Sequence, residues 1–169
     1  MSTLKVGTIQ DHANSNTAIS IDSSGRVTKP VNPAWRAQLS SAQNSSSSNS
    51  FVVNWNDTSS DGCFLQGGCT LSSGLLTVPI AGVYQVNVNV RFANTSSTYL
   101  EVYMKINNTD HQSYHLIGDP YGSYHSASMG SSFKLSASDN IRILVNAQGD
   151  TDYDIQASNL SHFSGFLVG

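Results

Sequence analysis

The chain has 169 residues, 11% of them charged and 38% hydrophobic, and a formal net charge of −3. This length fits one domain with a short appendage, and the apolar content is high enough for a packed core, which argues against a disordered chain. Without runs of Lys and Arg, the sequence offers no basic surface for nucleic acid or anionic membranes. We expect no nucleic-acid partner, no signal peptide and no membrane insertion.

Residues 1–33 have the pattern of a small β segment. The stretch AISIDSSGRVTKP (residues 18–30) predicts a β-hairpin, in which Gly25 suits the left-handed position of a short turn. Pro33 marks a boundary, because proline interrupts regular structure. We therefore predict an N-terminal β-hairpin appendage for attachment at residues 1–33 and a head domain at residues 34–169.

In residues 34–169 the sequence pattern predicts a succession of short strands, and it shows hardly any helical periodicity. The longest strand, GVYQVNVNVRF (residues 82–92), alternates between aliphatic or aromatic residues and a polar face of Gln, Asn and Arg91, on which amides predominate over charge. Such a face suits burial against a neighbouring subunit, and the alternation is typical of an antiparallel strand. The pattern predicts an all-β, antiparallel jelly-roll sandwich. The other predicted strands are residues 34–39, 51–55, 74–78, 99–106, 126–135, 140–147 and 161–168.

The last of these strands, SHFSGFLVG, carries apolar groups on both faces. Phe163 and Leu167 share one face with Gly165, while Phe166 and Val168 lie on the other. A strand that is apolar on both sides is typical of one covered on both sides. We expect the chain to end inside a sheet.

Three segments resemble the globular heads of the complement C1q type, which share a trimeric jelly roll with tumour necrosis factor. The first is GLLTVPIAGVYQVNVNV, and ASDNIRILVN and SHFSGFLVG resemble the last two strands of that family. Val86 and Val88 depart from the family, which often has aromatic residues there. The resemblance covers about residues 34–169 and implies a homotrimer whose final strand lies mid-sheet, beside the axis. The matching residues of the first segment are Gly74, Leu75, Thr77, Pro79, Gly82 and Tyr84.

The trimer that this resemblance implies needs residues near its axis. We expect the aromatic side chains of Tyr84, Tyr103 and Phe163 to contribute to the trimer interface. Burial of a few large apolar side chains per subunit, at roughly 1.5–3 kcal/mol each, is sufficient to hold such an assembly.

The first third of the chain resembles the opening of tailed-phage virion proteins, particularly those of cyanophages. The segments are LKVGTIQ, AISIDSSGRVTKP and PAWRAQLSS. This resemblance implies a virion protein, made in the host cytoplasm and released by lysis. Its opening motif favours a tail fibre or fibre tip that touches a host glycan or protein, with residues 1–33 bound to the tail or baseplate. The short chain favours the alternative, a trimeric capsid decoration protein.

The sequence contains no motif for catalysis. It has no G-x-S-x-G, P-loop or dinucleotide-binding pattern, so we expect no enzyme and no organic cofactor. His111 and His115 have the spacing of a zincin helix, but the adjacent Glu is missing and the surroundings have the pattern of a loop. With Tyr114, Tyr121 and Tyr124 they form a candidate ligand-binding loop, because tyrosine presents a flat apolar ring with a polar tip.

Two further clusters leave alternatives open. The first cluster consists of three alternating aspartates, Asp150, Asp152 and Asp154, whose carboxylates share one side of an extended chain. They form either a calcium site or a solvated acidic loop. Cys63 and Cys69 are separated by a Gly-containing stretch. They either close a small loop as a disulfide or remain free thiols, and two cysteines alone make a zinc site unfavourable.

Overall fold

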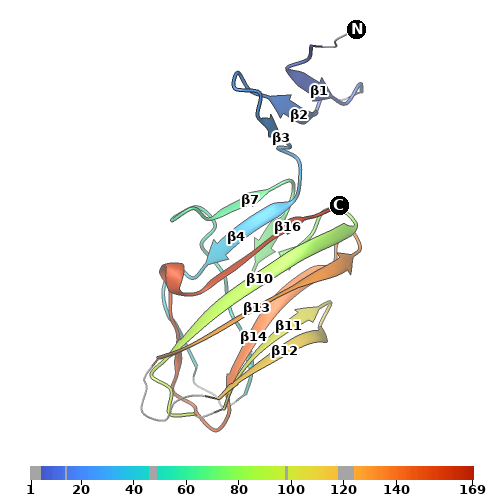
Figure 1. Cartoon of the computed structure of the whole chain (residues 1–169). Helices are drawn as coiled ribbons and strands as arrows, with labels where there is room; N and C mark the ends of the chain where they lie inside the picture. Colours follow the sequence, from blue (N-terminus) through green and yellow to red (C-terminus); the bar gives the residue numbers. More distant parts are fainter. Residues whose placement is uncertain (1–4, 14, 46–48, 98, 118–123) are drawn as a thin grey trace.

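The computed structural model describes residues 5–13, 15–45, 49–97, 99–117 and 124–169, with the backbone alone for residues 111–117. The chain forms a small N-terminal sheet and two larger sheets that stack face to face (Figure 1). This confirms the predicted all-β, antiparallel jelly-roll sandwich. Within the described residues, no helix has the length and hydropathy needed to cross a membrane.

The N-terminal sheet has three strands in the order β1-β2-β3 and projects from one end of the sandwich (Figure 1). Its second turn is built around Asp22, whose carboxylate accepts hydrogen bonds from the backbone N–H groups of Ser24 and Arg26, both at 2.9 Å. Gly25 has a φ of +77°, as the predicted hairpin turn requires. The strands are β1 (Thr8–Gln10), β2 (Thr17–Ile21) and β3 (Val27–Thr28).

The first layer of the sandwich is a seven-stranded sheet with β10 near its centre. Strand β13 pairs with β10 on one side, and β16 and β15 pair with it on the other. The last strand, β16, is itself paired with both β10 and β4, so the predicted mid-sheet position of the C-terminal strand is confirmed. The members are β4 (Ala34–Gln38), β5 (Gln43–Asn44), β7 (Phe64–Gln66), β10 (Gly82–Ala93), β13 (Tyr124–Leu135), β15 (Asp154–Ile155) and β16 (His162–Leu167).

The second layer is a six-stranded sheet, in which β14 pairs with β11, β9 and β6. Its edge strand β12 pairs along its length with β11, where the sequence pattern had indicated a loop; that expectation was wrong. A short 3-10 turn, η1 (Ser158–Leu160), precedes β16 in the other layer. The members of the second layer are β6 (Phe51–Val52), β8 (Thr70–Ser72), β9 (Leu75–Thr77), β11 (Tyr99–Ile106), β12 (Thr109–Ile117) and β14 (Asn140–Ala147).

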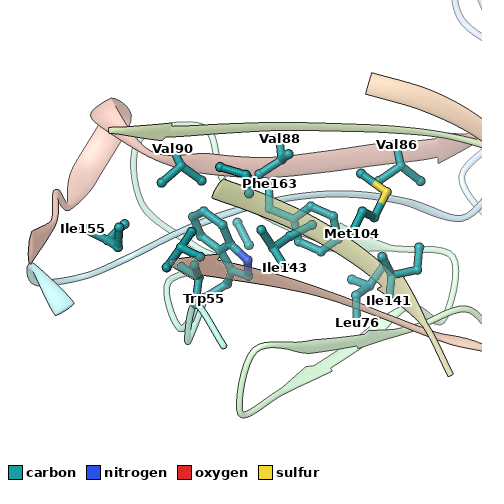
Figure 2. Packing of buried hydrophobic residues seen from close by; sticks show 14 of the residues in the cluster. Trp55, Leu76, Val86, Val88, Val90, Met104, Ile141, Ile143, Ile155 and Phe163 are labelled. Atoms are coloured by element: carbon teal, nitrogen blue, oxygen red, sulfur yellow. The ribbon is translucent and has the colours of Figure 1, made fainter. Parts of the chain in front are cut away.

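The hydrophobic core fills the space between the two layers (Figure 2). The aliphatic face of β10 meets residues such as Met104, Ile141 and Ile143 of the six-stranded sheet. An aromatic group centred on Phe163 closes one part of the core, with ring centroids 5.6 Å from Trp35 and 6.0 Å from Trp55. These contacts fix which face of each sheet points outward.

Candidate functional site

The outward face of the seven-stranded sheet carries a row of side-chain amides and hydroxyls across its central strands. We call it the amide face. It follows directly from the alternation of valine with Gln and Asn in β10, since the valines are buried in the core. The facing positions of β13 are small, and β16 contributes two polar residues. The amide face comprises Gln85, Asn87, Asn89, Ser128, Gly130, Ser132, His162 and Ser164.

The polar groups of the amide face bond mainly to one another. The hydroxyl of Ser132 donates to Gln85 Oε1 at 2.7 Å, and the hydroxyl of Ser128 donates to Asn89 Oδ1 at 2.6 Å. Gln85 Nε2 in turn donates to Asn87 Oδ1 at 3.2 Å. Because the groups in these three bonds already have partners, a second protein surface can cover them at a smaller desolvation cost than free amides and hydroxyls would impose. His162 differs, since its Nδ1 is buried without a hydrogen-bond partner among the described residues.

A hollow of about 410 Å³ lies on the amide face where Gly130 replaces a side chain. A Cβ at Gly130 would stand 2.5 Å from Asn87 Oδ1, so the glycine is needed for the asparagine to lie where it does. His162 borders the hollow, and burial, followed by the charge of Arg36, lowers its pKa. The imidazole is therefore neutral at pH 7, and the hollow is polar but uncharged.

The two ends of the amide face differ in character. At one end Val83, Phe166 and Val168 are exposed, Phe166 to 50%, and a 2.7 Å hydrogen bond from Val168 N to Val83 O holds the valines side by side. We call these three residues the apolar end. At the opposite end the Arg91 guanidinium lies 4.5 Å from the centroid of the Tyr124 ring. Lys134 pairs opposite Val83 on the outward side, so each end of the face also carries a cation and the middle is neutral.

Two of the residues predicted at the trimer interface lie elsewhere. Tyr84 and Phe163 have no exposed area in the single chain, because both point into the core between the sheets. They cannot touch a neighbouring subunit, so that prediction was wrong; the hydroxyl of Tyr84 donates instead to Ile80 O at 2.9 Å. The alternation that put Tyr84 on the valine face of β10 already indicated a core position.

Tyr103 is partly exposed on the outward face of the six-stranded sheet, on the opposite side of the sandwich from the amide face. Its phenol bonds to Glu101, whose carboxylate also accepts a hydrogen bond from Asn146 Nδ2 at 2.8 Å. Burial, followed by this bond to the carboxylate, raises the pKa of Tyr103. Beside them, Lys105 pairs with Asp110 at 3.0 Å. These groups bond to one another, and Tyr103, Lys105 and Asp110 also line a hollow of about 230 Å³.

The five candidate ligand-binding residues do not form one loop. His111, Tyr114 and His115 belong to strand β12, where His115 pairs with Glu101 of β11. Tyr121 lies outside the described residues. Tyr124 begins β13 and is 56% exposed, with one ring face occupied by Arg91. Of the five, Tyr124 is the residue that the structure shows as an accessible aromatic side chain.

The three aspartates predicted as a calcium site separate in the structure. Asp150 accepts hydrogen bonds from Thr95 Oγ1 at 2.9 Å and Ser96 N at 2.7 Å, and Asp154 accepts them from side-chain amides of Asn44 and Asn94. Nowhere in the described part of the chain do three His, Cys, Asp or Glu side chains converge as metal ligands would. The three carboxylates therefore do not form one ligand cluster in the structure, and calcium binding stays an untested prediction.

Asp150 has a structural role. Burial by itself raises its pKa, but hydrogen bonds from the Asp152 N–H, the Ser96 N–H and the hydroxyls of Thr95 and Ser96 outweigh that effect, and the net pKa is lowered. The carboxylate is ionised at neutral pH and ties the β10–β11 connection to the turn that follows β14.

Cys63 and Cys69 are free thiols, and both are buried. They flank β7, with Gly67 and Gly68 between them at φ values of +65° and +86°. Burial raises the pKa of the Cys69 thiol to about 11 and is also the main cause of the raised pKa of Cys63. The alternative of free thiols is the one the structure shows.

The fold and the amide face define a class of protein: a two-layer antiparallel jelly roll whose central strands present a broad outward face. Residues 34–168 match the C1q domain, and the chain belongs to the C1q domain family. C1q domains typically form trimers, and the fold serves structural or recognition roles. A comparison with curated proteins found no match for this chain.

Proposed function

We propose that this chain is a non-enzymatic homotrimer in which three amide faces meet around a threefold axis. The observation that carries this proposal is the amide face itself. Its middle is uncharged and bonded internally, and its apolar end exposes Val83, Phe166 and Val168. Burying these three apolar side chains in each copy contributes roughly 1.5–3 kcal/mol per side chain, and a closed ring uses the same patch on every subunit.

The trimer is tested by the mass of the protein in solution and by a charge placed on the amide face. Light scattering is expected to return three times the 18.1 kDa mass of the chain. Ser128→Glu introduces a carboxylate into the middle of the face and should give monomers. Ser72→Glu, at an exposed position of β8 in the other sheet, is the matched control and should remain trimeric. A monomeric wild-type protein would refute the trimer, and a trimeric Ser128→Glu protein would refute the choice of face.

For the role of the trimer, we propose host attachment in a phage virion, as a tail fibre or fibre tip. The likeness of LKVGTIQ and AISIDSSGRVTKP to phage virion proteins supports this, and so does the division into a projecting N-terminal sheet and a head of a recognition fold. Residues 1–33 would attach the trimer to the tail, and the head would contact the host surface. Three weak sites per trimer gain strength through effective concentration.

Two measurements test this role. Electron microscopy of phage particles in which this protein carries a label is expected to show the label at the tail. Excess purified trimer should compete with the phage for adsorption to host cells. Copies on the capsid, with adsorption unchanged, would indicate the decoration role instead. Hydrolysis of a host polysaccharide by the purified trimer, lost on substitution of one carboxylate, would contradict the non-enzymatic part of the proposal.

A further inference from the structure

One side of the N-terminal sheet carries an aliphatic patch, bordered by the side chains of Gln10 and Thr17, which bond to each other at 3.3 Å. Backbone pairing places Ile9 beside Ile19 and Ile21 beside Val27, and Ile19 and Ile21 are two residues apart on β2, so all four side chains share one side. The other side carries small residues, with Thr8 paired to Ser20 and Ser20 paired to Thr28. We call the first side the aliphatic face.

No part of the chain that the structure describes covers the aliphatic face, although Ile19 and Ile21 are half-buried within the sheet. Among the described residues from 5 to 32, none is buried; Ile9 is 47% exposed and Val27 60% exposed. A single layer of short strands cannot bury its own apolar side, and stable domains place a second layer against it. The sheet is nevertheless well formed, with a β2–β3 turn held by the Asp22 carboxylate and its 2.6 Å ion pair to Arg26. It therefore needs a partner surface.

The position of the segment indicates which partner. The N-terminal sheet joins the head at β4, and Ala34, the first residue of β4, pairs with Phe166 of the apolar end. A 2.9 Å hydrogen bond from Leu167 N to Pro33 O fixes the junction there. If three amide faces meet around an axis, three N-terminal segments leave the head next to that axis. Their aliphatic faces are then the apolar surfaces nearest to one another.

We propose that the aliphatic faces of three copies pack against one another and form a trimeric stem that continues the axis of the head. This inference rests on the proposed homotrimer. Each copy contributes four side chains, Ile9, Ile19, Ile21 and Val27, and their removal from water stabilises the stem. The Thr8, Ser20 and Thr28 side faces outward and is the side available to another virion protein.

Cysteine crosslinking in the full-length chain identifies the occupant of the face. Ile19→Cys places a thiol on the aliphatic face, and a short bis-maleimide should join two of the three chains into a covalent dimer on a denaturing gel. Ser20→Cys, one residue away on the opposite side, is the matched control and should not crosslink. The wild-type protein should also give no dimer, because Cys63 and Cys69 are buried. Far-UV circular dichroism checks that each variant is folded.

Hydrogen exchange supplies a second, independent readout. The backbone N–H groups of β2 should exchange slowly in the wild-type trimer. Their exchange should be at least tenfold faster in Ile21→Asp and unchanged in Ser20→Asp. If the mass is trimeric but the N–H groups of β2 exchange rapidly, or if positions 19 and 20 crosslink equally, the proposed stem is wrong while the trimeric head still stands. A monomeric mass would instead refute the proposed trimer, so the two failures are distinguishable.

Discussion

Gly165 is the residue at which the C-terminal strand is most closely packed. It lies opposite Trp35, and a Cβ built at this position would stand 2.4 Å from Trp35 Cζ2 and 2.6 Å from the backbone oxygen of Gln85. The indole cannot move aside easily, because the Phe163 and Tyr84 rings lie 5.6 and 6.3 Å from it. Gly165→Ala therefore forces either the ring or the β10–β16 ladder to shift.

Overpacking of this kind typically costs about 1–3 kcal/mol, and the backbone obstacle puts Gly165→Ala at the upper end, near 3 kcal/mol. For a chain of this size that corresponds to a fall in Tm of about 6–12 °C. Thermal and urea unfolding followed by tryptophan fluorescence measure it, at matched concentrations because association raises apparent stability. Ser72→Ala, at an exposed position of β8 in the other sheet, is the control and should stay within about 0.5 kcal/mol of the wild type. A loss below about 1 kcal/mol for Gly165→Ala would refute this reasoning.

Three further predictions concern buried polar groups. Asp150→Asn should lower the free energy of unfolding by about 1.5–3 kcal/mol at pH 7. Because folding lowers the pKa of Asp150, this difference between variant and wild type is complete above the unfolded pKa of 3.8 and disappears as pH falls through the folded pKa. Urea unfolding at several pH values measures it. Cys63 and Cys69 should react slowly with a thiol reagent at pH 8 in the native protein, because both are buried. After unfolding without reductant both thiols should react, whereas a disulfide would leave neither of them reactive. Tyr84→Phe should cost about 1 kcal/mol through its lost bond to Ile80 and leave the mass in light scattering unchanged, since Tyr84 lies inside the subunit.

Alternation along single strands made the sandwich predictable. In β10 the valines and the amides separate cleanly, and the apolar residues of β16 indicated a strand flanked on both sides. Alternation shows which residues share a face, but both the core face and a subunit face can be apolar. For this reason Tyr84 and Phe163 were assigned to an interface although they fill the core.

Features that depend on distant partners were not predictable. Strand β12 is rich in polar and His residues and becomes a strand through its ladder with β11. Asp150 finds its partners at Thr95 and Ser96, more than 50 residues earlier in the chain. The aliphatic face of the N-terminal sheet likewise needs β1 to bring Ile9 beside β2, which the hairpin pattern of residues 18–30 did not reveal.

The composition of the amide face also bears on how three copies would find one register. Hydrophobic contacts lack direction, so the apolar end supplies stability without fixing a unique alignment. In the middle of the face, Ser128 and Asn89 bond within one chain and leave neither a charge nor a free acceptor that a neighbour must match. In the proposed trimer the shape of the surface, including the hollow at Gly130, would therefore set the register. Arg91 lies on the same face, one outward position along β10 from the partner of Ser128. Ser128→Glu is nevertheless expected to separate the subunits, because a neighbouring copy would remove the added carboxylate from water, and that desolvation cost can exceed the gain from a nearby cation.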